Sequence, residues 1–321
     1  MKILVTGCAG FIGFHLCNYL AKKNNYFVYG IDNLNNYYDI SLKKKRLNIL
    51  KKKNNFLFKK IDIIKEDSIN TFFKNNKIDI IYHLAAQAGV RYSISSPRTY
   101  LESNIVGFFN ILEVSRKFKI KHLLFASSSS VYGTQNIFPL KEDNNTDKPD
   151  SFYAATKKSN EVMAYSYSNI YNLKVTALRF FTVYGPFGRP DMALFKFTKN
   201  ILKNKKIDLY NRGNHERDFT FIDDVVYKIY KLLDKPSKKL VPYQVFNIGN
   251  GKPEKLSNFI KEIERSTKLK AKKNLLPFQK GDVHKTHAST LKINKILGKN
   301  KKTTIKEGIS KFIIWFKKYY I

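Results

Sequence analysis

The chain has 321 residues, 43% of them apolar, and is long enough to bury a large core in one or two domains. Its apolar runs fall short of the roughly 18 residues that a membrane helix requires, and Met1 leads almost directly into an apolar strand. We therefore expect neither a membrane segment nor a signal peptide. Only Cys8 and Cys17 are present, too few for a disulfide framework, so the reducing cytoplasm is the expected location.

The formal net charge is +34, from 59 lysines and arginines against 25 aspartates and glutamates. Such a balance commonly indicates nucleic-acid binding. Here, however, the lysines are scattered through every segment and do not gather in one motif. We interpret the charge as a compositional bias and expect no specific nucleic-acid site, although the positive field would attract an anionic substrate.

The first motif is a glycine turn between an expected strand and an expected helix. The apolar run 2–6 leads into GCAGFIG at 7–13, and a helical pattern follows. Gly7 allows a tight turn, Gly10 lets the backbone approach a pyrophosphate, and Gly13 permits close helix packing. A lone glycine pattern is weak, but strand, turn and helix together favour dinucleotide binding. We predict cofactor contacts at Gly7, Gly10, Phe11, Ile12 and Gly13.

The next expected strands supply further cofactor candidates. The run 27–31 ends at Asp32, whose carboxylate would bind the adenosine ribose and repel a 2′-phosphate, which favours NAD over NADP. The alternative is that Asp32 only caps a helix. Asn33 follows it, and Asp62 and Ile63 follow the run 56–61, where they are expected beside the adenine.

The run 78–86 predicts a buried strand that ends in Leu84, Ala85 and Ala86, small enough for close approach to the cofactor. His83 lies within this run and is expected to be a packed core residue. Further strands are predicted at 123–126 and 175–180, with a long helix between Pro97 and Phe118. Alternating strands and helices imply an α/β, Rossmann-like, doubly wound parallel sheet, whose ligands bind at the carboxyl ends of the strands.

After residue 180 the elements become shorter and the loops longer. We predict a cofactor-binding domain at 1–180, with 218–250 packing back onto it, and a smaller C-terminal α/β substrate domain at 181–321. The amphipathic segment 309–320 is expected to be a docked terminal helix, with membrane-surface binding as the alternative. The lysine-rich stretches 43–46 and 51–53 are expected to form a solvated helix face.

The segment SFYAATK at 151–157 places a phenol and an ammonium four residues apart near an expected helix start. Residues at this spacing share one helical face, so Tyr153 and Lys157 would lie together. A nearby cation lowers the pKa of a phenol toward the range where it can act as a base. Taken alone, the pair could equally be a surface tyrosine beside a solvated lysine. The serine run 127–130 and the glycine turn favour a catalytic role.

With these motifs in place, the chain resembles the extended short-chain dehydrogenase/reductase superfamily over essentially its full length, and more narrowly the UDP-glucuronate 4-epimerases. The matching strings are DNLNNYYD at 32–39, QAGVRYS at 87–93, GRPDMA at 188–193, RDFTFIDD at 217–224 and GDV at 281–283. Two places depart from the usual pattern: Phe14 stands where a small serine is usual, and Asn211-Arg212-Gly213 replaces a more acidic turn.

The resemblance implies an NAD-dependent isomerase that converts UDP-glucuronate to UDP-galacturonate through a 4-keto sugar, with no metal. Tyr153 would act as the base, Lys157 would lower its pKa and bind the nicotinamide ribose, and Ser128 would bind the same sugar oxygen. Related dehydratases carry an Asp-Glu pair after the catalytic Ser or Thr, and decarboxylases typically a Glu. Ser129 and Ser130 stand at these positions and favour epimerisation alone.

The resemblance also assigns the remaining site residues. Thr182 and Arg189 would hold the hexuronate carboxylate, since a guanidinium binds carboxylate in a fixed fork. Arg217 would bind the diphosphate, and Arg91 would shape the pocket or contact phosphate; a surface ion pair is the alternative for each arginine. The full set adds Gln87 and Asn104 for the cofactor, and Ser128, Ser129, Ser130 and Asp282 for the substrate.

Three alternatives stay open. A 4-epimerase of UDP-glucose or UDP-N-acetylglucosamine would keep the chemistry and change the sugar. A UDP-glucuronate decarboxylase or a 4,6-dehydratase is also possible. From another class, a catalytically silent NAD-sensing or polyanion-binding protein would exploit the positive charge. Finally, similar enzymes dimerise through helices that correspond to 97–118 and 153–171, so the resemblance implies a homodimer.

Overall fold

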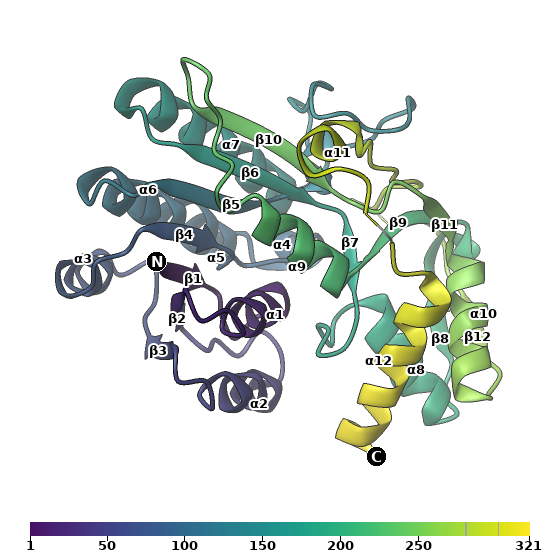
Figure 1. The fold of residues 1–321 in the computed structure, drawn as a ribbon. Coiled ribbons are helices and arrows are strands. Elements are labelled where there is room, and N and C mark those ends of the chain that lie inside the picture. Colours follow the sequence, from purple (N-terminus) through teal and green to yellow (C-terminus); the bar gives the residue numbers. More distant parts are fainter. Residues whose placement is uncertain (280, 301) are drawn as a thin grey trace.

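The computed structural model describes residues 1–279, 281–300 and 302–321. Within this part of the chain the largest sheet has seven parallel strands in the order β3-β2-β1-β4-β5-β6-β10 (Figure 1). Six of them follow the strand order of a dinucleotide-binding sheet. The strands are β1 (Lys2–Thr6), β2 (Phe27–Asp32), β3 (Phe56–Lys60), β4 (Ile80–His83), β5 (His122–Ser128), β6 (Val175–Phe180) and β10 (Tyr243–Ile248).

Helices cover both faces of this sheet. On one face, α1 (Phe11–Leu20) packs against α2 (Ile40–Leu50) and α9 (Ile222–Lys231). On the other, α6 (Gly107–Lys117) packs against α3 (Glu66–Asn75) and α7 (Phe152–Tyr171). Strand side chains alternate between the two cores: Ile3 and Val5 pack with α1, whereas Leu4 packs with α3 and α6. This two-sided burial explains the nearly continuous apolar runs of the strands.

The long helical pattern that begins at Pro97 is one continuous helical segment made of three consecutive elements. It consists of α5 (Pro97–Tyr100), the π-helix η1 (Leu101–Val106) and α6. The short helix α4 (Tyr92–Ser95) precedes it, and the 3-10 helix η2 (Ser129–Tyr132) follows β5. The predicted helix and the strands at 123–126 and 175–180 are thus confirmed, while the strand expected at 78–86 is shorter and ends at His83.

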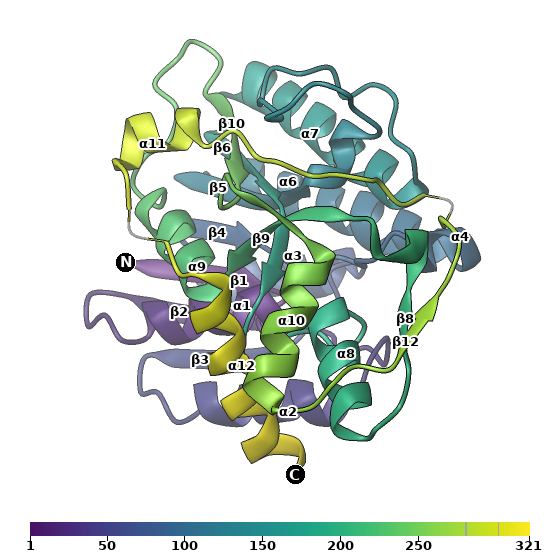
Figure 2. The same ribbon diagram turned by 90° about the vertical axis from the view of Figure 1, so that its right-hand side faces the viewer.

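The C-terminal elements stand beside the carboxyl ends of the sheet (Figure 2). One small sheet contains β7 (Thr182–Tyr184), β9 (Glu216–Phe221) and β11 (Pro253–Lys255), and β8 (Ile207–Leu209) pairs with β12 (Lys273–Leu275). The helical elements here are α8 (Ala193–Leu202), η3 (Tyr210–Gly213), α10 (Leu256–Thr267), α11 (Leu291–Leu297) and α12 (Ile305–Tyr320). Because β10 pairs with β6, the chain returns to the large sheet after β9. We propose the cofactor-binding unit as 1–180 with 218–250 packed back onto it, and 181–321 as the substrate unit.

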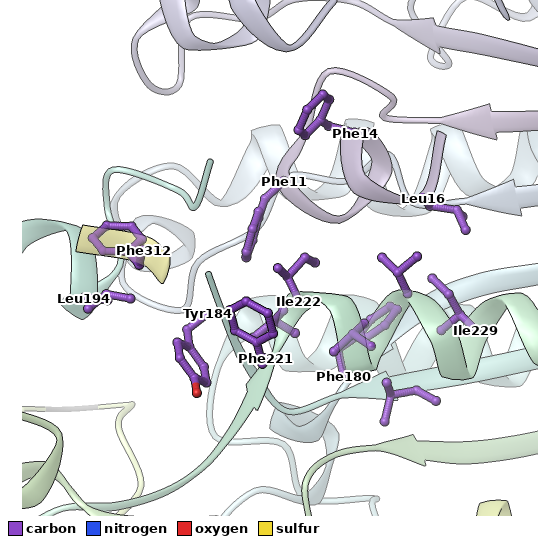
Figure 3. Packing of buried hydrophobic residues seen from close by; sticks show 14 of the residues in the cluster. Phe11, Phe14, Leu16, Phe180, Tyr184, Leu194, Phe221, Ile222, Ile229 and Phe312 are labelled. Carbon is purple, nitrogen blue, oxygen red and sulfur yellow. The ribbon is translucent and has the colours of Figure 1, made fainter. Parts of the chain in front are cut away.

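One hydrophobic core joins the two parts of the chain. Phe11 and Phe14 of α1 share one buried cluster with Ile222 and Ile229 of α9, and the cluster continues to Phe312 of α12 (Figure 3). The buried residues of α12 confirm the expectation of a docked terminal helix. Among the described residues, no helix is both long and apolar enough to cross a membrane.

The expectation of a solvated lysine face on α2 is wrong for part of its first stretch. Lys44 and Lys45 are exposed, but Lys43 is 5% exposed and Arg46 is fully buried. The ammonium of Lys43 donates to the backbone and side-chain oxygens of Asn35, both at 2.7 Å. Charge counting along a helix cannot foresee such burial, because the oxygens that satisfy the cation belong to other segments.

Candidate active site

A cavity of about 960 Å³ lies between the carboxyl ends of the large sheet and the C-terminal elements. Of the residues predicted from the sequence, all but one line it. They are Gly7, Gly10, Phe11, Ile12, Gly13, Asp32, Asn33, Asp62, Ile63, Leu84, Ala85, Ala86, Gln87, Arg91, Ser128, Ser129, Ser130, Tyr153, Lys157, Thr182, Arg189, Arg217 and Asp282. The exception is Asn104.

The glycine turn is too crowded for side chains and leaves a helix end open. A Cβ on Gly7, whose φ is +71°, would lie 2.8 Å from the backbone nitrogen of Ala85, and one on Gly13 would lie 2.1 Å from the oxygen of Gly7. Gly10 precedes α1 and provides no side-chain cap. The first amide groups of α1 are therefore available to an anion at the cavity wall, which fits a pyrophosphate.

Asp32 lies at the end of β2, where it accepts hydrogen bonds from the backbone nitrogens of Ala9 at 3.1 Å and Leu34 at 2.8 Å. Burial raises its pKa, against the opposing effect of these hydrogen bonds and of nearby cations. It is not the cap of α2, because Asp39 holds that place. The side chain of Asn33 donates to Asp62 at 3.0 Å. This hydrogen bond connects the residues expected to bind the ribose with those expected beside the adenine.

Asn104 is buried behind the cavity wall. Its side chain accepts from the backbone nitrogen of Gln87 at 2.8 Å and donates to the oxygen of the same residue at 3.0 Å. It also donates to Thr156 at 3.0 Å. This amide thus holds the Gln87 backbone, a role that motif matching does not distinguish from direct contact with a cofactor.

One other prediction in this region, that for His83, has a clear outcome. His83 is the core residue that was expected: its ring shares a 2.9 Å hydrogen bond with the Thr6 hydroxyl, and burial lowers its pKa to about 3. The Thr6 hydroxyl also accepts from the backbone nitrogen of Ala85 at 3.0 Å. Through this contact the buried pair fixes the small-residue segment against the glycine turn.

The proposed catalytic residues come together from β5 and α7. Ser151 caps α7 by accepting from the backbone nitrogen of Ala154 at 3.1 Å, which starts the helix where the sequence predicted. Ser128 is the last residue of β5, and its hydroxyl accepts from the backbone nitrogen of Ser130 at 3.1 Å. The ammonium of Lys157 donates to the carbonyl of Ala126 at 2.9 Å.

The electrostatics of the phenol differ from the sequence-based expectation. Burial raises the pKa of Tyr153, and the groups that oppose this effect are the Ser128 hydroxyl, through a hydrogen bond, and the positive charge of Arg189. Burial also lowers the pKa of Lys157 to about 8. The charge of Lys157 is not among these causes, and its ammonium donates to the carbonyl of Ala126.

A buried ion pair supports this wall and was not foreseen. Glu161 of α7 binds the guanidinium of Arg179 of β6 through both carboxylate oxygens, at 2.9 and 2.8 Å. The Ser127 hydroxyl donates to Glu161 at 2.6 Å. The two charged side chains are 5% and 6% exposed. Since Ser127 precedes Ser128, the ion pair links α7, β6 and the end of β5.

Arg189, which also lines the cavity, already holds a carboxylate. Its guanidinium donates to both oxygens of Asp191, with the Nε contact at 3.0 Å, and Tyr37 donates to the same carboxylate at 3.2 Å. Despite burial, these contacts lower the pKa of Asp191. Asp191 and Tyr37 lie within strings that the sequence comparison singled out, but neither had an assigned role.

Arg91 and Arg217 also line the cavity. Arg217 donates to Asp282 at 2.7 Å, and the guanidinium of Arg91 lies 4.3 Å from the ring centre of Tyr210. Lys43, Lys196 and Lys285 also line the cavity and were missed, because isolated lysines in a lysine-rich chain give no signal. The cluster of cations fits a ligand with several negative charges.

Comparisons with known proteins agree with this geometry. Protein CapI of Staphylococcus aureus is 49% identical over 334 residues, covering 100% of this chain and 99% of that protein. A UDP-glucuronate 4-epimerase of Thermodesulfobacterium geofontis is 43% identical, covering 98% and 95%. The solved structure of UDP-glucuronic acid 4-epimerase from Bacillus cereus in complex with UDP-glucuronic acid and NAD is 34% identical, with a TM-score of 0.93 and full coverage of both chains. The profile described as the NAD dependent epimerase/dehydratase family matches residues 3–249, and the chain belongs to that family.

Proposed function

We propose that this protein is an NAD-dependent isomerase that inverts C4 of UDP-glucuronate to give UDP-galacturonate, reversibly and through a 4-keto sugar. Relatives named for this reaction support the proposal, as does a similar solved structure that binds UDP-glucuronic acid and NAD. The observation that carries it is one cavity whose wall contains the dinucleotide-binding turn, Ser128 and Tyr153, and the three arginines Arg91, Arg189 and Arg217.

Bound NAD supplies the group that takes a hydride from C4 of the sugar and returns it to the opposite face. Tyr153 takes the proton of the 4-hydroxyl and gives it back when the sugar is reduced. Ser128 donates a hydrogen bond that favours the phenolate, and Arg189 favours it through its charge. Lys157, with a pKa of about 8, is mostly an ammonium at neutral pH and would bind the nicotinamide ribose.

The residues after Ser128 separate epimerisation from related reactions. Ser129 and Ser130 offer neither a carboxylic acid nor a carboxylate for eliminating water or promoting decarboxylation. In the described part of the chain, no glutamate lines the cavity. A 4-keto intermediate therefore meets no further acid or base at these positions and is reduced again.

A 4-keto hexuronate is a β-keto acid and loses carbon dioxide readily. An enzyme that only epimerises it must hold the carboxylate in an orientation that disfavours this loss. Thr182 begins β7 and Arg189 follows that strand, and both line the cavity. We assign the carboxylate to these two residues and the diphosphate to Arg217, since charge-assisted bonds from a guanidinium are strong and directional.

The test is to incubate the purified protein with UDP-glucuronate and identify the product. UDP-galacturonate without carbon dioxide is the expected result, and Tyr153→Phe should abolish turnover while leaving bound NAD in place. A pentose product, or unchanged substrate with fully NAD-loaded protein, would contradict the proposal.

One observation favours a second candidate, a 4-epimerase of UDP-glucose or UDP-N-acetylglucosamine. Asp191 already neutralises Arg189, which reduces the attraction for a hexuronate carboxylate. Parallel assays with UDP-glucose and UDP-glucuronate decide between them: a kcat/KM that is higher for the neutral sugar would select the second candidate.

We also propose that the enzyme is a cytoplasmic homodimer. Large apolar side chains lie exposed along η1 and α6 at Leu101, Val106 and Phe109, and along α7 at Val162 and Ile170. Because α6 and α7 pack side by side, these residues form a surface suited to a second copy. Cys8 and Cys17 are free and buried, which suits a reducing compartment.

A further inference from the structure

The guanidinium of Arg46 joins two segments that are far apart in the sequence. It donates from Nη1 to the backbone oxygen of Ala9 at 2.7 Å and from Nη2 to the backbone oxygen of Phe187 at 2.6 Å. The hydroxyl of Tyr38 accepts a further bond from Nη1 at 2.7 Å. Ala9 belongs to the glycine turn, and Phe187 lies two residues before Arg189.

Burying the Arg46 cation costs free energy, which indicates that its hydrogen bonds serve to position the segments they join. Arg46 is fully buried, its hydrogen bonds go to neutral oxygens, and its Nε has no partner among the described residues. A buried cation without a paired carboxylate destabilises the fold unless its N–H groups donate hydrogen bonds of good geometry. The planar fork of an arginine can reach two carbonyls in fixed directions, which the point charge of a lysine cannot do.

We call the hydrogen bonds from Arg46 to the carbonyls of Ala9 and Phe187 the Arg46 bridge. Other side chains also hold the segment at each end of this bridge. The peptide of Ala9 is held on both sides, since its nitrogen donates to Asp32 at 3.1 Å while its oxygen accepts from Arg46. On the far side, the carbonyl of Pro186 accepts from His15 of α1 at 2.9 Å. Burial lowers the pKa of His15 to about 4, so the ring is neutral and donates through Nε2 at neutral pH.

The loop that carries Arg189 adopts a conformation that needs such support. Phe187 has a φ of +55°, unfavourable for a residue with a bulky side chain. Its ring contacts those of Phe14 and Trp315, whose ring centres are each 4.9 Å from its own. The loop is thus fixed to α1 through the ring of Phe187 and the carbonyl of Pro186, and to α2 through the carbonyl of Phe187.

We propose that Arg46 is a positioning residue that ties the dinucleotide-binding turn to the loop carrying Arg189, so that one buried fork supports both cofactor retention and affinity for the hexuronate. The part of this inference that concerns hexuronate affinity rests on the proposed function. The part that concerns cofactor retention rests on the geometry alone. Arg46 does not touch the reacting atoms; it acts through Ala9 and Phe187.

The test compares Arg46→Lys and Arg46→Met with Lys44→Met, an exposed position on the same helix. Three quantities are measured: NAD retained after gel filtration, kcat and KM for UDP-glucuronate, and the inhibition constant of UDP. We expect Arg46→Lys to retain less NAD and to raise KM about tenfold, the size of one lost charge-assisted bond, with kcat changing less than about threefold. UDP lacks the hexuronate, so its inhibition constant should stay unchanged.

The inference is overturned if Arg46→Lys matches Lys44→Met in NAD content and KM, or if UDP binding weakens as much as substrate binding, which would indicate general structural damage. Should Arg46→Met fail to fold, Arg46→Lys still decides, because it keeps the buried charge and loses only the fork. A wild-type protein that does not convert UDP-glucuronate would refute the proposed function. The NAD content of the Arg46 variants would still test the bridge.

Discussion

At the residue scale, the hydroxyl of Ser128 influences how readily the neighbouring phenol ionises. Burial favours the neutral form of Tyr153, and the bond from Ser128 and the charge of Arg189 favour the phenolate. The spacing of Tyr153 and Lys157 identifies the pair, but the groups that oppose burial come from β5 and from the loop after β7. The catalytic pKa is therefore a property of three segments.

Ser128→Ala should lower kcat by about 10- to 100-fold at pH 7, because it removes one hydrogen bond to a charged oxygen. Its loss raises the pKa of Tyr153, so less phenolate exists at neutral pH. Because burial raises the pKa of Tyr153 above its ordinary value, both proteins hold little phenolate from pH 6 to pH 9, and the deficit should be constant there. It should shrink only as the pH rises further toward that pKa and the phenol ionises in both proteins. Rates measured from pH 6 to about pH 11 check this, and a deficit that stays constant up to the alkaline end would show that Ser128 acts in another way.

Arg189→Met should change sugar preference. Without the guanidinium, the carboxylate of Asp191 remains and repels a hexuronate, so the ratio of kcat/KM for UDP-glucuronate to that for UDP-glucose should fall by about 100-fold. Any change in the pKa of Tyr153 affects both sugars and cancels in this ratio. An unchanged ratio would assign the carboxylate to other residues.

At the element scale, the pairing of Glu161 and Arg179 connects α7 to β6 beneath the catalytic strand. Glu161→Gln leaves the buried guanidinium without its counter-charge and should lower the free energy of unfolding by about 3 to 5 kcal/mol. Urea denaturation measures this loss. The double variant Glu161→Leu, Arg179→Leu should lose less than the single one, since it leaves no unpaired charge.

The β5 strand also contains a buried neutral histidine. His122 shares hydrogen bonds with the oxygen of Leu233 at 2.9 Å and the hydroxyl of Thr176 at 2.8 Å, and burial lowers its pKa to about 4. Between pH 6.5 and about 4 the unfolded chain binds a proton here that the native protein does not. Stability should therefore fall as pH falls through this window.

His122→Gln tests this point, because glutamine does not titrate. Its free energy of unfolding should depend less steeply on pH, by up to about 1.4 kcal/mol per pH unit between pH 6 and pH 5. Urea denaturation at pH 8, 6 and 5 separates this slope from the constant cost of the substitution. Equal slopes for variant and parent would show that His122 is protonated in the native state.

At the scale of the whole molecule, the exposed apolar surface on η1, α6 and α7 is the feature that a monomer does not explain. Val162→Glu places a charge in this surface and should give a monomer in sedimentation or light-scattering measurements. Leu240→Glu, at a 99% exposed apolar residue outside this surface, is the matched control and should leave the mass unchanged. A parent protein that is monomeric at micromolar concentration would refute the proposed dimer.

The sequence alone determined the local features: the strand, glycine turn and helix at the N-terminus, the start of α7 at Ser151, and the sheet class. Each depends on neighbours within a few residues, where apolar period, caps and glycines act directly. The predicted site residues other than Asn104 line the cavity, and those of the cofactor motifs do so because the motifs stand at strand ends, which a parallel sheet brings together.

Only the tertiary structure decided which partners those residues meet. The placing of Asn104 behind Gln87, the pairing of Glu161 with Arg179 and the burial of Arg46 depend on residues from 17 to 141 positions apart. The pairing of Asp191 with Arg189 is local, and its geometry depends on the loop that carries both residues. A charged side chain carries the same sequence signal whether it is solvated or buried. Its environment, and with it its pKa and its role, is set by the segments that fold against it.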